Sequence, residues 1–186
     1  MTELATQLAQ AAAELAAAAA ATDPVALGEL AEELALARRI VTYGCGREGL
    51  MLRALAMRLY HLGLDVQVQG DMACPPLGPG DLLLAASGPG HLATVAALIG
   101  QARAAGARTA CLTARPDGPD PRACHIVLTI PAQTMASDRG ADTALLPMGS
   151  VFEGALFLVF EILVLRLRQR LGESPETMRA RHTNLE

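Results

Sequence analysis

Residues 41–49 read Val-Thr-Tyr-Gly-Cys-Gly-Arg-Glu-Gly, and this stretch decides the fold. A short β-rich run ends in three glycines, Gly44, Gly46 and Gly49, and a helical pattern follows at once. A strand, a glycine turn and a helix present backbone N–H groups and the positive end of a helix dipole to an anionic or polar ligand. The stretch therefore predicts an α/β domain and the edge of the sheet at which it binds a ligand.

A second copy of this arrangement occupies residues 81–90, which read Asp-Leu-Leu-Leu-Ala-Ala-Ser-Gly-Pro-Gly. It passes from an apolar strand pattern through a turn that contains Ser87, Gly88 and Gly90, and then into another helix. We expect the two strands to lie side by side, so that the two glycine turns outline one pocket.

Apolar runs and helical periodicities alternate along the rest of the chain. Asp23 suits the N-cap of a helix and Pro24 its first position, which predicts a break between two N-terminal helices. The expected helices span 2–21, 24–38, 47–62, 91–105 and 150–171, with a short one from Pro175; the expected strands span 40–43, 64–68, 81–86, 108–113 and 126–130; residues 70–80, 115–121 and 131–148 are expected to be loops or irregular.

Strands that alternate with helices and are apolar on both faces predict a parallel sheet covered on both sides. Right-handed crossovers then give a three-layer, doubly wound α/β fold with five parallel strands, in which ligands bind at the carboxyl ends of the strands. We expect one domain over residues 1–186, with a helical arm (1–38), a sheet core (39–149) and C-terminal helices with a tail (150–186).

The composition narrows the classes of partner. Of the 186 residues, 52% are hydrophobic and 18% are charged, which predicts an ordered domain with a sizeable core. A net charge of −4, the lack of a basic cluster and 3% aromatic residues argue against a nucleic-acid partner. The four cysteines are scattered, as is typical of reduced thiols in a cytoplasmic protein and not of disulfides or a zinc site.

Two stretches are apolar enough to be compared with membrane segments, residues 11–21 and 150–167. Both contain charged residues, so we expect buried helices and no membrane partner. The first residues carry Glu3 and lack a basic start, so no signal peptide is expected. The N-terminal helices are expected to serve in subunit contact, because so alanine-rich a surface packs closely against another helix; a helix pair that serves only in packing is the alternative.

The glycine spacing G-x-G-x-x-G also fits a dinucleotide site, which needs an acidic residue at the end of the second strand. Asp71 lies roughly there, but Met-Ala-Cys-Pro-Pro follows it and not a regular crossover. A dinucleotide site also leaves the second glycine turn unexplained. We therefore rank a dinucleotide site well behind a site for another anionic or polar ligand.

Five segments together resemble the sugar isomerase (SIS) domain family, and within it the 6-phospho-3-hexuloisomerase branch, which converts a 3-hexulose 6-phosphate to fructose 6-phosphate. They are residues 44–49, 59–63 (Leu-Tyr-His-Leu-Gly), 87–90, 147–153 (Pro-Met-Gly-Ser-Val-Phe-Glu) and 178–186 (Met-Arg-Ala-Arg-His-Thr-Asn-Leu-Glu). The resemblance implies a five-stranded sheet of flavodoxin-like topology and a homotetramer or dimer of dimers with shared active sites. It implies no metal and no nucleotide cofactor.

The chain departs from this family where the family binds phosphate. Glu48 stands where the first turn usually has a serine, and Pro89, His91 and Leu92 replace the serine, glutamate and threonine of the second turn. Of the hydroxyls that the family uses, Ser87 remains. A carboxylate about 4 Å from a like charge costs on the order of 4 kcal/mol at an effective dielectric of ~20. Arg47 and the helix ends still favour an anion, and Glu48 and His91 are expected to form a pair that replaces phosphate recognition.

Moving a carbonyl along a sugar requires a base that removes the proton from the adjacent carbon, and an acid that returns a proton to the neighbouring one. Glu153 is the expected base, because it begins an apolar helix directly after an irregular loop. A carboxylate that only complements the helix dipole is the alternative. The match of Phe152-Glu153 to the family favours the base.

His182 lies in a polar tail, where it is either a solvent-exposed residue or a proton shuttle. The match of the terminal Arg-His-x-Asn-Leu-Glu to the family favours the shuttle, and the resemblance implies that the tail reaches a neighbouring subunit's pocket. For His61, an acid/base role and a core or interface role both stay open. His125 is expected to be structural.

Three functions stay open, in this order: a hexuloisomerase-type sugar-phosphate isomerase, a related enzyme for an unphosphorylated or altered sugar, and a non-catalytic domain that binds a sugar derivative. The expected catalytic residues are Glu153, His182 and His61. The expected substrate-binding residues are Gly44, Gly46, Arg47, Glu48, Ser87, Gly88, Gly90, His91, Met148 and Asn184. No metal ligand is expected.

Overall fold

The structure, a computed structural model, describes residues 2–137 and 145–185. A five-stranded sheet forms its centre, in the order β2-β1-β3-β4-β5, and every neighbouring pair is parallel. The strands are β1 (Ile40–Gly44), β2 (Val66–Val68), β3 (Leu82–Ala86), β4 (Arg108–Thr113) and β5 (Ile126–Thr129). This order is the flavodoxin-like one, so the predicted doubly wound α/β fold is confirmed.

The helices are α1 (Glu3–Ala20), α2 (Pro24–Leu36), α3 (Gly46–His61), α4 (Ala93–Ala104), α5 (Pro119–Arg122), α6 (Ser150–Leu171) and α7 (Pro175–Ala180). Asp23 caps α2 as predicted, because its side chain accepts the N–H of Val25 at 2.9 Å. The single turn α5 was not expected. It forms inside the predicted loop because Pro119 and Pro121 fix backbone dihedrals that suit a helical turn.

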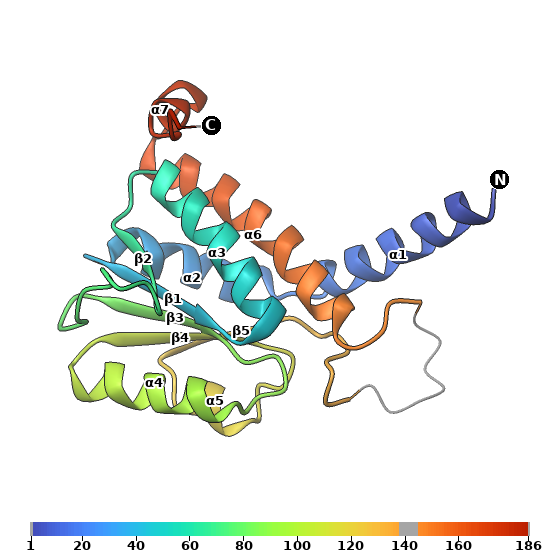
Figure 1. The fold of residues 1–186 in the computed structure, drawn as a ribbon, viewed down its shortest axis with the longest axis horizontal. Helices are drawn as coiled ribbons and strands as arrows, with labels where there is room; N and C mark the ends of the chain where they lie inside the picture. The colour runs from blue at the N-terminus through green and yellow to red at the C-terminus, as the bar shows by residue number, and fades with distance from the viewer. Residues whose placement is uncertain (1, 138–144, 186) are drawn as a thin grey trace.

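Two layers of helices enclose the sheet (Figure 1). Helix α4 covers one face, where Val95 and Ile99 pack on Val41 and Leu83. Helices α2 and α3 cover the other face, and α6 lies across both of them. Phe152 at the start of α6 is 1% exposed and belongs to the larger of the two cores.

The N-terminal region differs from the expected arm of two helices. Helix α2 packs into the core through Leu30 and Leu34, both 0% exposed. Helix α1 projects from the body (Figure 1), and Ala18 is its one buried residue among those described. The expectation that residues 11–21 form a buried helix is therefore wrong for a single chain, because α1 extends beyond the layer that it would pack on. In the described ranges, no helix combines the length and the apolar character needed to cross a membrane.

The register of the sheet positions the glycine turns. Gly44 at the end of β1 pairs with Ala86 at the end of β3, so the two turns lie side by side as predicted. The N-terminus of α3 lies at the same end of the molecule as the N-terminus of α6 (Figure 1). Backbone N–H groups from several segments therefore converge at this edge.

Candidate active site

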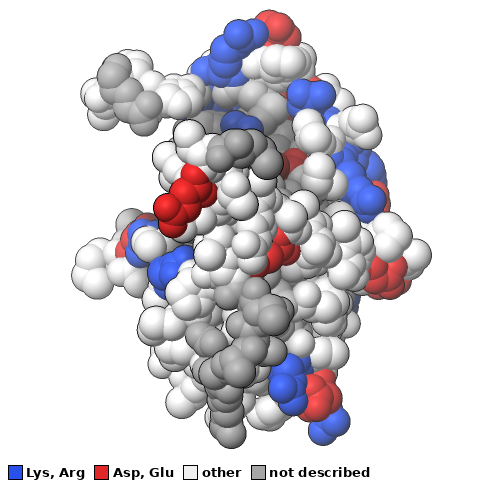
Figure 2. Space-filling model, turned by 90° about the vertical axis from the view of Figure 1, so that its right-hand side faces the viewer, with Lys and Arg blue, Asp and Glu red and all other residues white. Residues whose placement is uncertain are grey.

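A cavity of about 600 Å³ lies at the carboxyl ends of β1 and β3, between the starts of α3 and α6. It is lined by Cys45, Gly46, Arg47, Glu48, Pro89, His91, Leu92, Thr134, Met135, Ala136, Met148, Gly149, Phe152 and Glu153. Uncharged residues dominate this side of the molecule, with a few separate acidic and basic groups (Figure 2). Five of the ten expected substrate-binding residues line this cavity together with Glu153: Gly46, Arg47, Glu48, His91 and Met148.

The glycines of the first turn act by their small size. A Cβ atom on Gly49 would lie 2.4 Å from the carbonyl oxygen of Gly44, so helix α3 can start against β1 only with glycine at this position. Gly46 has a φ of +56°, in the left-handed region that favours glycine. Gly44 is not among the residues that line the cavity, and its part in the site is to let the turn close.

Glu48 reaches from the first turn to the second. Its two carboxylate oxygens accept the N–H of Gly88 at distances of 3.2 and 3.1 Å. A Cβ on Gly88 would lie 2.6 Å from Oε1 of Glu48, so this contact also needs a glycine. Burial raises the pKa of Glu48 to about 7, the negative charge of Glu153 adds to this rise, and the Gly88 N–H opposes it.

The second turn is organised by Asp120, a residue that the sequence analysis did not single out. Asp120 is 2% exposed. Its Oδ2 accepts the hydroxyl of Ser87 at 2.7 Å and the N–H of Leu92 at 2.8 Å, and its Oδ1 lies 3.0 Å from Nδ1 of His91. A buried carboxylate with three such partners holds the whole turn in shape.

Two expectations for this turn are wrong. Ser87 is 0% exposed and its hydroxyl bonds to Asp120, so the hydroxyl does not face the cavity. Glu48 and His91 do not form the expected pair, because Glu48 bonds to Gly88 and His91 bonds to Asp120. His91 itself lines the cavity, as expected.

Glu153 lies in the first turn of α6 and faces Arg47 of α3. Its Oε2 lies 2.8 Å from Nη2 of Arg47, and its side chain is 14% exposed. Nη1 of Arg47 donates to the hydroxyl of Ser150 at 3.2 Å. Burial raises the pKa of Glu153, and the nearby charge of Arg47 partly offsets the rise. Oε2 is buried in this ion pair, and no hydrogen bond from the described residues satisfies it further.

The residues before α6 have an unusual backbone. Met148 has a φ of 55° and is the one non-glycine residue with a positive φ among those described. Gly149 follows with a φ of 81° and serves as the N-cap of α6. A left-handed conformation costs a methionine roughly 1–2 kcal/mol, and such strain is common at functional sites. The left-handed backbone at Met148 and Gly149 turns the chain so that Met148 and Glu153 line the same cavity.

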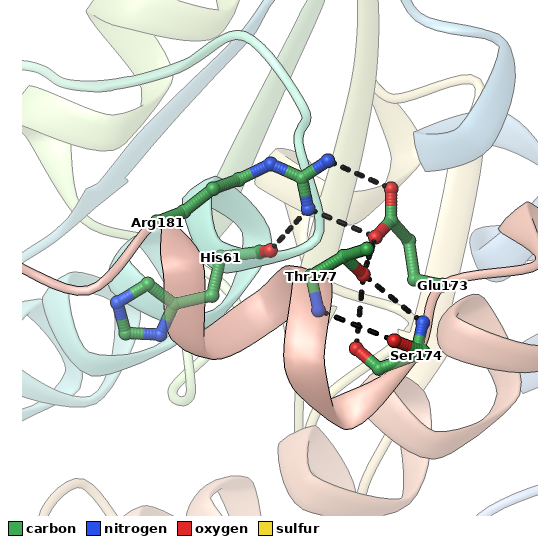
Figure 3. Close-up of polar contacts among 5 residues, drawn as sticks. All are labelled: His61, Glu173, Ser174, Thr177 and Arg181. Atoms are coloured by element: carbon green, nitrogen blue, oxygen red, sulfur yellow. Dashed lines mark hydrogen bonds and ion pairs between the residues drawn. The ribbon is translucent and has the colours of Figure 1, made fainter.

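The two expected catalytic histidines lie together elsewhere. The rings of His61 and His182 stack with centroids 5.2 Å apart. Arg181 attaches the tail there: it donates to the carbonyl of His61 at 2.8 Å and to both carboxylate oxygens of Glu173 at 2.9 Å (Figure 3). Arg181, with Thr177, lowers the pKa of Glu173 to about 2. Asn184 and both histidines line a cavity of about 510 Å³ at this end.

Helix α6 separates Glu153 from the histidines. His61 and His182 share a cavity with Glu161, Val164 and Leu165 of α6, and the 8 to 12 residues by which these follow Glu153 rise about 12–18 Å along the helix axis. Helix α7 and the tail follow at the far end of α6 (Figure 1). Within one chain, Glu153 and His182 therefore line different cavities, whereas the resemblance implies that they meet between subunits.

The structure also accounts for residues outside the cavity. His125 accepts the N–H of Thr109 at 3.0 Å, in line with the structural role expected for it. Within residues 2–137 and 145–185, no three His, Cys, Asp or Glu side chains are placed to hold a metal ion. Glu186 of the expected tail motif lies outside the described residues.

Sequence analysis missed several lining residues. Thr134, Met135 and Ala136 lie in the irregular segment after β5, where no pattern indicates which side chains face the cavity. Asp120 follows a proline in a polar stretch, and nothing in the sequence distinguishes it from an exposed loop carboxylate.

Comparison with known proteins shows the family to which the chain belongs. The model of the SIS domain family matches residues 33–153. The chain is 40% identical over 173 residues to a 3-hexulose-6-phosphate isomerase of Mycobacterium gastri, which covers 93% of this chain and 86% of the relative. It is 32% identical over 158 residues to the enzyme of that name from Bacillus subtilis (strain 168), which covers 85% of each chain.

A solved structure shares the fold. It is a protein of Methanococcus jannaschii, and its description infers a molecular function of 3-hexulose-6-phosphate isomerase. The TM-score is 0.83 at 22% sequence identity, over 97% of this chain and 99% of that chain. With a family model that matches more than half of its length and relatives at this level of identity, the chain belongs to the SIS domain family.

Proposed function

We propose that the protein is an isomerase of the 6-phospho-3-hexuloisomerase type, which moves a sugar carbonyl to the neighbouring carbon through an enediol or enediolate. The names of the curated relatives support a sugar phosphate isomerase as the general class. The observation that carries the proposal is Glu153, whose carboxylate lines the cavity, is largely buried and forms an ion pair with Arg47.

In this proposal, Glu153 removes the proton from the carbon next to the carbonyl, and the electron pair of that C–H bond forms the enediolate. The protonated Glu153 then returns a proton to the former carbonyl carbon, while the hydroxyl proton of the first carbon passes to the former carbonyl oxygen, so that no net atom is gained or lost. Burial raises the pKa of Glu153, which makes it a stronger base than an exposed carboxylate. Arg47 lines the same cavity beside Glu153, and its fixed positive charge is expected to stabilise the negative charge that develops on the substrate oxygens.

We further propose that a second copy of the chain supplies His61, His182 and Asn184 to this cavity, in a homotetramer or dimer of dimers. The exposed faces of α3 and α6 carry apolar side chains between the two ends of the molecule, which suits burial against a second copy. These side chains are Leu50, Met57, Phe157, Ile162 and Leu165. A histidine that enters from another subunit can exchange protons with substrate oxygens near pH 7.

The test is solvent exchange. The purified protein is incubated in heavy water with fructose and with fructose 6-phosphate, and proton NMR follows the carbons next to the carbonyl. We expect deuterium to enter at these carbons with one of the two sugars and a second ketose to accumulate. Absence of exchange with both sugars, in a protein that is folded, would contradict the proposed reaction.

A further inference from the structure

The second glycine turn has little left with which to bind an anion. The N–H of Gly88 donates to Glu48, the N–H of Gly90 to the carbonyl of Ser87 at 2.9 Å, and the N–H of Leu92 to Asp120. Pro89 has no N–H. A turn that binds phosphate presents such groups to the ligand, whereas this turn uses them within the chain.

Glu48 itself occupies the position of an anion. Its carboxylate lies between the two turns, with both oxygens on the N–H of Gly88. The absence of a Cβ on Gly88 makes room for it, since that atom would lie 2.6 Å from Oε1. A free carboxylate or phosphate group would bind a backbone N–H at a glycine turn in the same manner.

The other charges of the cavity reinforce this effect. Arg47, which lines the cavity, lies 2.8 Å from Glu153 and donates to Ser150. An incoming dianion would therefore meet one guanidinium that already has a carboxylate partner, and two carboxylates, Glu48 and Glu153. In a partly buried site, repulsion between such like charges makes binding of the dianion less favourable by on the order of 1 kcal/mol or more.

We propose that Glu48 determines substrate specificity: its carboxylate fills the anion position between the glycine turns, so that the cavity accepts the uncharged, hydroxyl-bearing end of a sugar there and excludes a phosphate. This inference rests on the proposed function for the identity of the ligand as a sugar. It keeps the proposed reaction and changes the proposed substrate from a phosphorylated ketose to one that is unphosphorylated at this position.

The groups at this position suit hydroxyls. A sugar hydroxyl donates to a carboxylate oxygen such as those of Glu48, and it can also accept a hydrogen bond. His91 lines the cavity with Nδ1 held 3.0 Å from Asp120, which leaves Nε2 as the ring nitrogen that can meet a hydroxyl. Carboxylate and imidazole together therefore bind neutral polar groups without a cradle of backbone N–H groups.

The experiment compares the wild-type protein with Glu48→Ser and Glu48→Gln at pH 8, above the pKa of about 7 at Glu48. Calorimetry measures the binding of inorganic phosphate, and the isomerase assay measures fructose against fructose 6-phosphate. Serine removes the carboxylate and releases the Gly88 N–H; glutamine keeps the shape and removes the charge. Glu32→Ser is the control, because Glu32 is exposed, pairs with Arg170 and does not line the cavity.

We expect Glu48→Ser to bind phosphate about tenfold or more tightly than the wild type. Glu48→Gln should lie between the two, and Glu32→Ser should match the wild type. The preference between fructose and its phosphate should move toward the phosphate in Glu48→Ser. Circular dichroism checks that each variant is folded. If Glu48→Ser is not folded, the comparison of the wild type with Glu48→Gln decides the outcome.

The outcomes separate the two proposals. Tighter phosphate binding in the Glu48 variants without isomerisation of either sugar would support the role of Glu48 and contradict the isomerase. Turnover of fructose 6-phosphate by the wild type, with a KM that Glu48→Ser leaves unchanged, would support the isomerase and overturn the role of Glu48. Equal phosphate binding in the wild type and the variants would also overturn it.

Discussion

Arg47 and Glu153 join the two helices that begin at the cavity: Nη2 of Arg47 lies 2.8 Å from Oε2 of Glu153. The contact connects α3, which follows the first glycine turn, to α6, more than 100 residues later in the chain. It sets the ionisation of the proposed base, because burial raises the pKa of Glu153 while Arg47 lowers it. Arg47 is therefore expected to affect the chemistry through Glu153 as well as through the substrate.

Replacing Arg47 by methionine should raise the pKa of Glu153 further, because the opposing positive charge is lost. The base is active when deprotonated, so the acid limb of the profile of kcat/KM against pH should move to higher pH. We expect kcat/KM to fall about tenfold or more at pH 6. Arg53→Met is the control on the same helix, because Arg53 pairs with Asp71 outside the cavity. An acid limb that stays in place would show that Arg47 does not act on Glu153.

Glu48 should make the stability of the protein depend on pH. The pKa of Glu48 rises from 4.5 to about 7 on folding, so the folded state holds the proton more tightly than the unfolded state does. This contribution is fully present below pH 4.5 and is lost as the pH rises through about 7. It corresponds to roughly 3 kcal/mol in the free energy of unfolding.

Urea unfolding at pH 5 and pH 8 tests this dependence. From pH 5 to pH 8, the free energy of unfolding of the wild type should fall by about 2–3 kcal/mol relative to that of Glu48→Gln, because glutamine does not titrate. Glu32→Gln, a change at an exposed pair with Arg170, should follow the wild type. Parallel pH profiles for the wild type and Glu48→Gln would contradict the raised pKa.

Asp120→Ala should destabilise the fold by about 2–4 kcal/mol, because it leaves the buried hydroxyl of Ser87 and the N–H of Leu92 without their acceptor. Asp117→Ala, at an exposed neighbour 3.7 Å from Arg115, should change the free energy of unfolding by less than about 0.5 kcal/mol. Chemical unfolding measures both. Equal stabilities for the two variants would show that Asp120 does not organise the turn.

Mixed subunits test the origin of the histidines. Glu153→Gln and His182→Asn should each be nearly inactive alone. If cavities are shared between chains, co-expression of the two variants should restore part of the activity, because some cavities then receive Glu153 from one chain and His182 from another. Co-expression of two chains that both carry Glu153→Gln provides the control, because no cavity then contains Glu153. Activity that does not recover in purified mixed assemblies would contradict the sharing of cavities between chains.

The sequence allowed the fold to be predicted because the signals are local. The strand, glycine turn and helix at residues 41–49 and the cap at Asp23 each depend on neighbours in the chain, and each is present in the structure. The parallel order then follows from the alternation of strands and helices. The short α5 was missed because prolines in a polar stretch suit a loop and a helical turn equally well.

The site was less predictable, because its contacts join distant parts of the chain. Residues 88–92 are near one another in sequence, but the partners that use their N–H groups, Glu48 and Asp120, lie about 30–40 residues away in the chain. Ser87 was expected to face the ligand, and only the position of Asp120 explains why it does not. The distance between Glu153 and His182 depends on the direction of α6, which a sequence pattern does not give.

The central claim is that Glu153 exchanges the proton of the substrate, and deuterium incorporation by Glu153→Gln tests it most directly. Glutamine keeps the size of the side chain and removes its basicity, so we expect exchange at the carbons next to the carbonyl to fall at least about 100-fold with little change in unfolding temperature. The protein that carries Glu32→Gln should exchange at the wild-type rate. Exchange by Glu153→Gln at the wild-type rate would contradict the account.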